Sequence, residues 1–150
     1  MTARLDIFNL APQAYKGLAA VKNALQESSL PRELLELVNL RVSQINGCAY
    51  CIDMHSRGLL THGVGVDKVV LVPVWREAEA LFTDKERAAL AWAETLTRVA
   101  QTNAPDADYQ QAAAVLGQKE LADVTMAMAL MNAFNRIGVG MRLVPAALAR

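Results

Sequence analysis

Residues 36–55 read ELVNLRVSQINGCAYCIDMH, and this stretch holds both cysteines of the 150-residue chain. Its first half places apolar side chains three and four residues apart, which is typical of a helix with a buried face. Asn46-Gly47 interrupts that helix, and a new helix is predicted to begin at Cys48 and to end near Gly63, because glycine fits the position after a helix end. The stretch therefore predicts two consecutive helices, with a C-x-x-C pair in the first turn of the second.

Helical spacing recurs in the rest of the chain, and no segment alternates between apolar and polar residues for long. The expected helix-capping residues are Ser28, Ser29 and Asp106, together with the T-x-x-E capping box of Thr83 and Glu86. Besides the helix from Cys48, the predicted helices span residues 12–27, 31–44, 66–72, 83–102, 106–117 and 119–137. The pattern indicates one all-α domain over residues 1–150, built from about six or seven helices.

The overall charge is balanced, with fifteen basic and fifteen acidic residues. This argues against a nucleic-acid-binding surface and against a polybasic membrane anchor. The longest apolar stretch, residues 69–75, is far shorter than the roughly 20 residues that span a bilayer, and the N-terminus does not resemble a signal peptide. We expect a cytoplasmic protein, and the 53% of hydrophobic residues with only 20% charged residues favours a homo-oligomer.

The C-x-x-C pair carries the chemistry that the sequence predicts. In a chain without an export signal, such a pair indicates redox or metal chemistry before a structural bridge. At about 100° per residue, His55 lies about 20° from Cys48 and Cys51 about 60° from it, so the three share one helix face. The helix start stabilises a thiolate at Cys48, and His55 is placed to take or give a proton. We infer a redox-active dithiol.

Three other interpretations of the cysteines are disfavoured. A zinc site would need His62, which lies about 10 Å along the helix from His55 and is too distant to share a tetrahedral site. Two inert buried thiols do not account for the C-x-x-C spacing or for the nearby histidine. A purely structural disulfide is uncommon in the expected compartment.

The segment from Glu36 to Cys51, followed by His55, resembles the carboxymuconolactone decarboxylase family and, more closely, its alkylhydroperoxidase AhpD-like branch. The signature of that branch is a glutamate, eleven residues, C-x-x-C, three residues and a histidine. Residues 81–97 and 121–136 are similar to the family more loosely. The resemblance implies an all-helical fold that assembles into trimers or hexamers and carries a peroxidase-type dithiol.

Carried over by position, the resemblance implies that Cys51 attacks the peroxide and that Cys48 resolves the resulting sulfenic acid. It also implies a proton relay through His55 and Glu36. The chain departs from the pattern of this branch at Tyr50, where the alkylhydroperoxidase proper has a histidine. The departure matters because a phenol does not relay protons at neutral pH as an imidazole does. The residues alone favour Cys48 as the more reactive sulfur, and the helical wheel favours a solvated Glu36.

The leading hypothesis is a thiol-dependent peroxidase that takes a peroxide and a dithiol reductant, either a protein or a small thiol, and uses no bound cofactor or metal. A second hypothesis is a dithiol–disulfide oxidoreductase or redox sensor with little peroxidase activity, which Tyr50 favours. A third is a non-catalytic oligomeric binding module that thiol oxidation switches. Asn132, Asn135 and Arg136 are interpreted as a polar subunit interface.

Overall fold

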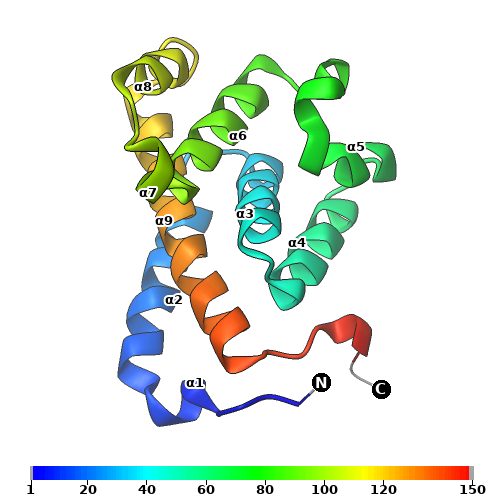
Figure 1. Cartoon of the computed structure of the whole chain (residues 1–150), viewed down its shortest axis with the longest axis vertical. Coiled ribbons are helices and arrows are strands. Elements are labelled where there is room, and N and C mark those ends of the chain that lie inside the picture. Colours follow the sequence, from blue (N-terminus) through cyan, green and yellow to red (C-terminus); the bar gives the residue numbers. More distant parts are fainter. Residues whose placement is uncertain (1, 149–150) are drawn as a thin grey trace.

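The computed structural model describes residues 2–148, which form helices and connecting turns and include no β-strand (Figure 1). The α-helices are α1 (Ile7–Leu10), α2 (Pro12–Gln26), α3 (Arg32–Asn46), α4 (Ala49–Thr61), α5 (Val66–Leu71), α6 (Asp84–Thr97), α7 (Val99–Thr102), α8 (Asp106–Ala113) and α9 (Gln118–Met141). Three short 3₁₀ helices are η1 (Val72–Glu77), η2 (Glu79–Leu81) and η3 (Ala146–Leu148). The predicted all-α class is confirmed, and the one-turn helix α1 adds to the predicted set.

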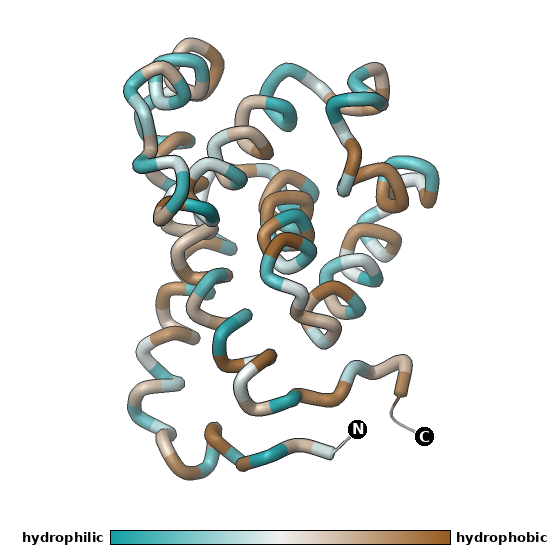
Figure 2. The backbone as a smooth tube through the Cα atoms, in the orientation of Figure 1, coloured by the Kyte–Doolittle hydropathy of each residue, from teal (hydrophilic) through white to brown (hydrophobic). Residues whose placement is uncertain are grey.

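Helix α3 lies at the centre and packs against α4, α6 and α9 (Figure 1). It is apolar on two sides, which Figure 2 shows as brown segments in the middle of the molecule. One side, including Val38 and Val42, packs into a cluster with residues of α6 and α9. The other side, with Leu37 and Leu40 fully buried, packs into a cluster with residues of α4, α5 and η1. Burying each of these leucines contributes about 1.5–3 kcal/mol, so α3 anchors both halves of the core.

The turn between α3 and α4 follows directly from Asn46-Gly47. Gly47 has a φ of 68°, which glycine adopts without strain. The N–H of Gly47 donates to the Gln44 carbonyl at 3.3 Å, and the N–H of Cys48 donates to the Ser43 carbonyl at 3.0 Å. These two hydrogen bonds make a Schellman motif. The chain then re-enters a helix at once, so Cys48 is the N-cap of α4.

Several predicted helix starts need correction. The Thr83–Glu86 capping box is present at the start of α6, as predicted. Neither Ser28 nor Ser29 caps α3, because Pro31 occupies its N-cap position. The Ser28 hydroxyl donates to the Leu25 carbonyl at the end of α2 instead. Asp106 is the first residue of α8 rather than its cap, since the preceding Pro105 occupies that position.

Helix ends differ from the prediction at three further places. The helix predicted over residues 106–117 ends four residues earlier, at Ala113. The predicted helix over residues 83–102 is interrupted at Arg98, which separates α6 from α7. The hydroxyl of Thr102 donates to the Thr95 carbonyl there, in place of a backbone partner. The last helix, predicted to end at Ile137, continues for one more turn to Met141.

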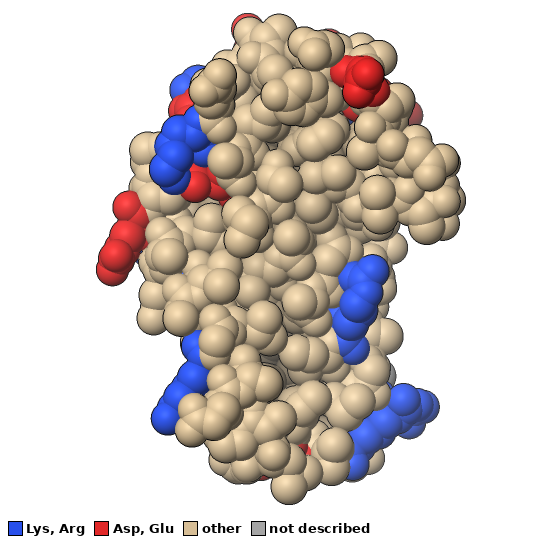
Figure 3. Space-filling view, turned by 90° about the vertical axis from the view of Figure 1, so that its left-hand side faces the viewer, with Lys and Arg blue, Asp and Glu red and all other residues tan. Residues whose placement is uncertain are grey.

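The molecular surface combines charged edges with uncharged areas. Figure 3 shows the side on which α8 and α2 lie, where charged side chains gather toward the edges and leave a broad uncharged area between them. Across residues 2–148, no helix is long and apolar enough to cross a membrane.

Candidate active site

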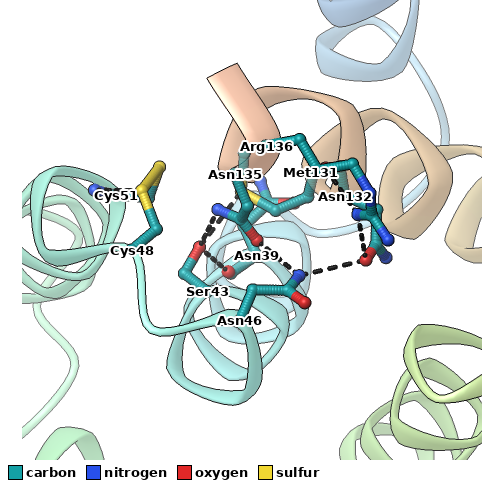
Figure 4. Close-up of a disulfide and its surroundings, with 9 residues drawn as sticks. All are labelled: Asn39, Ser43, Asn46, Cys48, Cys51, Met131, Asn132, Asn135 and Arg136. Carbon is teal, nitrogen blue, oxygen red and sulfur yellow. Dashed lines mark hydrogen bonds between the residues drawn. A yellow bond between two sulfur atoms is a disulfide. The ribbon is translucent and has the colours of Figure 1, made fainter. Parts of the chain in front are cut away.

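Cys48 and Cys51 form a disulfide at the N-terminus of α4, with their Cα atoms 5.3 Å apart (Figure 4). Both side chains are buried. The backbone N–H of Cys51 donates to Cys48 Sγ at 3.4 Å, which is the side-chain cap of the helix. Because a sulfur at this position receives the unpaired N–H groups and the positive end of the helix dipole, a thiolate is stabilised when the disulfide is reduced.

Helix α9 packs directly onto the disulfide at Gly138, which is buried. A Cβ atom at this position would lie 2.7 Å from Cys48 Sγ and 3.5 Å from Cys51 Sγ. The first distance is shorter than real carbon–sulfur packing allows, so the site needs a residue without a side chain here. Gly138 is therefore part of the site, although its place inside a long helix costs about 1 kcal/mol relative to alanine.

One turn beyond Cys51, His55 pairs with Glu36 of α3. The two side chains approach to 2.7 Å between His55 Nδ1 and Glu36 Oε2, with the histidine side chain 7% exposed and the glutamate 25% exposed. A carboxylate accepts only, so Nδ1 carries the proton and donates it to this hydrogen bond. In a neutral ring Nε2 is then the acceptor, and it is buried without a hydrogen-bond partner in the part of the chain that is described.

The position of Glu36 corrects the helical-wheel interpretation, which favoured a solvated glutamate. The carboxylate fits against α4 because Gly58 has no side chain, and a Cβ there would lie 2.9 Å from Glu36 Oε2. The wheel describes α3 alone and cannot include a helix that packs on its polar side.

Four of the five candidate residues line one cavity of about 360 Å³: Glu36, Tyr50, Cys51 and His55. Cys48 is not among the lining residues, although it is bonded to Cys51. The cavity thus reaches Cys51 and the histidine–glutamate pair together, whereas Cys48 lies beneath Gly138. A molecule in the cavity is therefore next to Cys51 and not next to Cys48.

Behind the disulfide, a polar network joins the end of α3 to α9 (Figure 4). The Asn46 side-chain amide donates to Asn132 Oδ1 at 3.0 Å and to Asn135 Oδ1 at 2.9 Å. The Asn135 amide donates to the Ser43 hydroxyl at 3.0 Å. Asn135 is only 1% exposed, so its interpretation as part of a subunit interface is wrong. The network holds the turn that positions Cys48.

Asn132 belongs to the same network, and exposed Arg136 donates to its side-chain and backbone oxygens. Sequence reasoning missed the contribution of these asparagines to the site, and it missed Gly58 and Gly138. A glycine inside a strongly helical segment was the available signal, since it suggests a packing or functional reason.

The sequence matches the carboxymuconolactone decarboxylase family over residues 12–95, more than half of the chain. It is 29% identical to the uncharacterized protein YdfG of Bacillus subtilis over 141 residues, which cover 94% of this chain and 95% of YdfG. It is 38% identical to the alkyl hydroperoxide reductase AhpD of Rhizorhabdus wittichii over 47 residues, which cover 31% of this chain and 27% of AhpD.

The fold is also similar to a solved structure, a protein of unknown function from Agrobacterium tumefaciens with a suggested AhpD-type role in antioxidant defence. The two superpose with a TM-score of 0.91 at 35% identity, covering 96% of this chain and 98% of the other. The resemblance inferred from residues 36–55 is therefore confirmed. The chain belongs to the carboxymuconolactone decarboxylase family, in its AhpD-like branch.

Proposed function

We propose that the protein is a thiol-dependent peroxidase that reduces hydroperoxides at Cys51. Membership of the AhpD-like branch and the Cys48–Cys51 disulfide fit an antioxidant role. The observation that carries the finer proposal is the cavity shared by Cys51 and the paired His55 and Glu36. It brings a candidate nucleophile and a candidate base to one substrate-sized space.

The first step oxidises Cys51. In the reduced protein, His55 Nε2 accepts the thiol proton while Glu36 holds the ring in the required tautomer. The thiolate attacks the terminal oxygen of the hydroperoxide, and the O–O bond breaks. The sulfur becomes a sulfenic acid, and the departing alkoxide takes a proton from the imidazolium and leaves as an alcohol.

The second step closes the disulfide. The Cys48 sulfur attacks Cys51 Sγ, the S–O bond breaks, and the oxygen leaves as water with the proton of the Cys48 thiol. A dithiol reductant then restores both thiols by exchange and is itself oxidised to a disulfide. The sum is one hydroperoxide and one external dithiol converted to one alcohol, one water and one external disulfide.

The short spacing of the two cysteines suits repeated opening and closing. Because the cysteines are three residues apart, the loop that the disulfide closes is small. Its entropic contribution to stability is about 2 kcal/mol, against about 4.7 kcal/mol for a 100-residue loop. Opening this bond in the reduced half of the cycle therefore costs the fold less than opening a disulfide that closes a long loop.

Trapping of the intermediate tests the proposal. In Cys48→Ser, we expect peroxide to leave a sulfenic acid on Cys51, detected by mass spectrometry after reaction with a sulfenic-acid-specific probe. Cys51→Ser should abolish turnover of a hydroperoxide with a dithiol reductant. Normal peroxidase rates in the Cys48→Ser/Cys51→Ser double variant would contradict the mechanism. So would a sulfenic acid trapped on Cys48 in Cys51→Ser with none trapped on Cys51 in Cys48→Ser.

A dithiol–disulfide oxidoreductase is the second candidate, and Tyr50 is the observation that favours it. Tyr50 lines the cavity where the alkylhydroperoxidase proper has a histidine, so proton transfer to a leaving alkoxide depends on His55 alone. The two candidates are separated by comparing the reduction of a generic disulfide with that of an organic hydroperoxide. A Tyr50→His variant should raise only the second rate.

A further inference from the structure

The cavity beside Cys51 is lined mainly by residues of four helices, α2, α3, α4 and α9, with Phe8 of α1 and Leu143 completing the lining. From α4 and its C-cap the cavity is lined at helical spacing by Tyr50, Cys51, Met54, His55, Gly58 and His62. The other walls come from α2, α3 and α9 with the same type of spacing, and they are mainly apolar. A rise of 1.5 Å per residue makes the lined face of α4 about 16 Å long. The space is thus shaped for an extended, mostly apolar molecule.

The two ends of this cavity differ in chemistry. Cys51 lies at the end where α4 begins. Glu36 of α3 contacts Gly58 of α4. Arg32 lies one turn before Glu36, and His62 lies one turn after Gly58, in the antiparallel direction. Arg32 and His62 therefore lie at the same, opposite end, where Lys22 near the end of α2 also lines the cavity.

The basic side chains at that end are free to bind an anion. Lys22 and Arg32 are exposed, and neither forms an ion pair with any residue in the range 2–148. The acidic residue among the described lining residues is Glu36, whose carboxylate is already hydrogen-bonded to His55. The far end of the cavity therefore carries two cationic side chains without an ion-pair partner in residues 2–148, and the acidic residue described in the lining, Glu36, lies a turn nearer to Cys51.

The walls between the two ends favour a hydrocarbon chain. They include the side chains of Leu35, Leu130, Met131 and Phe134. A molecule that fills this space buries apolar surface along most of its length, at roughly 25 cal/mol per Å². Near Cys51, His55 Nε2 is a buried polar atom without a partner in the described chain, and it can bond an oxygen on the ligand.

We propose that this cavity binds a long-chain monocarboxylate, with the carboxylate at Lys22 and Arg32 and the chain extending toward Cys51. A span of about 16 Å corresponds to about a dozen carbon–carbon bonds in an extended chain. Resting on the proposed peroxidase function, the substrate is the hydroperoxide of such an acid, with the peroxide group about that far from the carboxylate. It is converted to the hydroxy acid and water as the dithiol is oxidised to the disulfide.

Binding tests the inference without catalysis. Titration calorimetry compares dodecanoate with methyl dodecanoate, which has the same chain without the charge, on the oxidised protein. We expect dodecanoate to bind more tightly and its affinity to fall with added salt. The Lys22→Gln/Arg32→Gln variant should bind dodecanoate roughly tenfold more weakly. Lys16→Gln is the matched control, because Lys16 is exposed on the same helix and does not line the cavity.

Kinetics then separates this inference from the proposed function. With a long-chain hydroperoxy carboxylic acid, the Lys22→Gln/Arg32→Gln variant should show a raised KM and an unchanged kcat, while tert-butyl hydroperoxide is reduced at the wild-type rate. Dodecanoate binding without turnover of any hydroperoxide would refute the peroxidase and leave the binding site standing. Equal affinity for the acid and the ester, or equal affinity in the variant and the wild type, overturns the carboxylate site.

Discussion

At the residue scale, two glycines determine whether the side chains of the site can pack together. Gly138 lets α9 approach the sulfur atoms, and Gly58 leaves room for the Glu36 carboxylate beside His55. In both cases the side chain that is absent would occupy the space of a reacting group or its partner. Neither role depends on unusual backbone angles, since both glycines lie within helices.

Gly138→Ala should disrupt the packing of the disulfide. Its Cβ would overlap Cys48 Sγ, so we expect a loss of about 1–3 kcal/mol of stability and slower closure of the disulfide. Urea unfolding and quenched thiol labelling measure the two effects. Gly140→Ala is the control, because it lies in the same helix with nothing within 4 Å of its Cβ, and it should be neutral or stabilising. Equal behaviour of the two variants would contradict the packing role of Gly138.

Glu36→Gln should lower kcat by roughly ten- to hundredfold, because the amide no longer fixes the His55 tautomer that accepts a proton. Gly58→Ala should act in the same direction by displacing the carboxylate, and Gly17→Ala, with open space around its Cβ, should not. Peroxidase assays together with thermal unfolding separate this effect from a loss of fold. Full activity in Glu36→Gln would exclude Glu36 from the proton relay.

At the scale of elements, the orientation of α4 depends on how α3 is tied to α9. The Schellman turn at Gly47 sets the direction of the chain, and Asn46 fixes the end of α3 by hydrogen bonds to Asn132 and Asn135. Buried amides of this kind are costly when a partner is lost. The polar network therefore contributes to the placement of Cys48 as well as to stability.

Asn135→Ala should destabilise the protein by about 2–4 kcal/mol, since it leaves the Asn46 amide and the Ser43 hydroxyl with fewer partners and opens a cavity. A double-mutant cycle with Asn46→Ala should show a coupling of about 1 kcal/mol or more. Chemical denaturation measures both quantities. Asn23→Ala on exposed α2 is the control, and additive effects of the Asn46 and Asn135 substitutions would contradict the network.

Across the whole molecule, Glu94 joins α6 to α3 and η1. Its carboxylate accepts hydrogen bonds from Arg41 at 2.5 Å, from Arg76 at 2.5 Å and from the Trp75 indole at 3.0 Å. Burial acts to raise the pKa of this carboxyl, but the hydrogen bonds from Arg76 and Arg41 outweigh it, and the net pKa lies below its usual 4.5. A lowered pKa in the folded state means that the ion pairs stabilise the fold at neutral pH.

This stabilisation should be fully present above pH 4.5 and should disappear as the pH falls through the lowered pKa of folded Glu94. Glu94→Gln should cost about 2–3 kcal/mol at pH 7, and its difference from the wild type should shrink below pH 4.5. Urea midpoints across this range measure the effect. Exposed Glu77→Gln serves as the control, and a difference that does not change with pH would contradict the assignment.

The surface of the whole molecule also bears on assembly. Large apolar side chains such as Leu10, Tyr15, Tyr109, Val115 and Met126 are 40–68% exposed, and Figure 3 shows a broad uncharged area on one side. We expect these surfaces to be buried between copies of the chain. Light scattering at micromolar concentration should report a mass that is a multiple of 16.3 kDa. A monomer at all concentrations would contradict this expectation.

Local sequence patterns were sufficient for the helices and for the core of the site. The spacing of apolar residues predicts most helices, and the Thr83–Glu86 capping box and the positive φ at Gly63 are where the sequence places them. Asn46-Gly47 followed by C-x-x-C predicts a helix start at Cys48. These features depend on hydrogen bonds and side-chain spacings within a few residues, so the sequence contains them directly.

The tertiary structure alone decided what surrounds the cysteines. The Glu36 carboxylate pairs with His55 of α4, and Asn135 is buried and not at a subunit surface. Gly138 lets α9 pack directly against the disulfide. Each of these depends on a helix that is distant in the chain, and a helical wheel describes only the helix on which a residue lies. The sequence by itself determined the helices and the reactive pair, whereas packing between distant helices determined which side chains meet them.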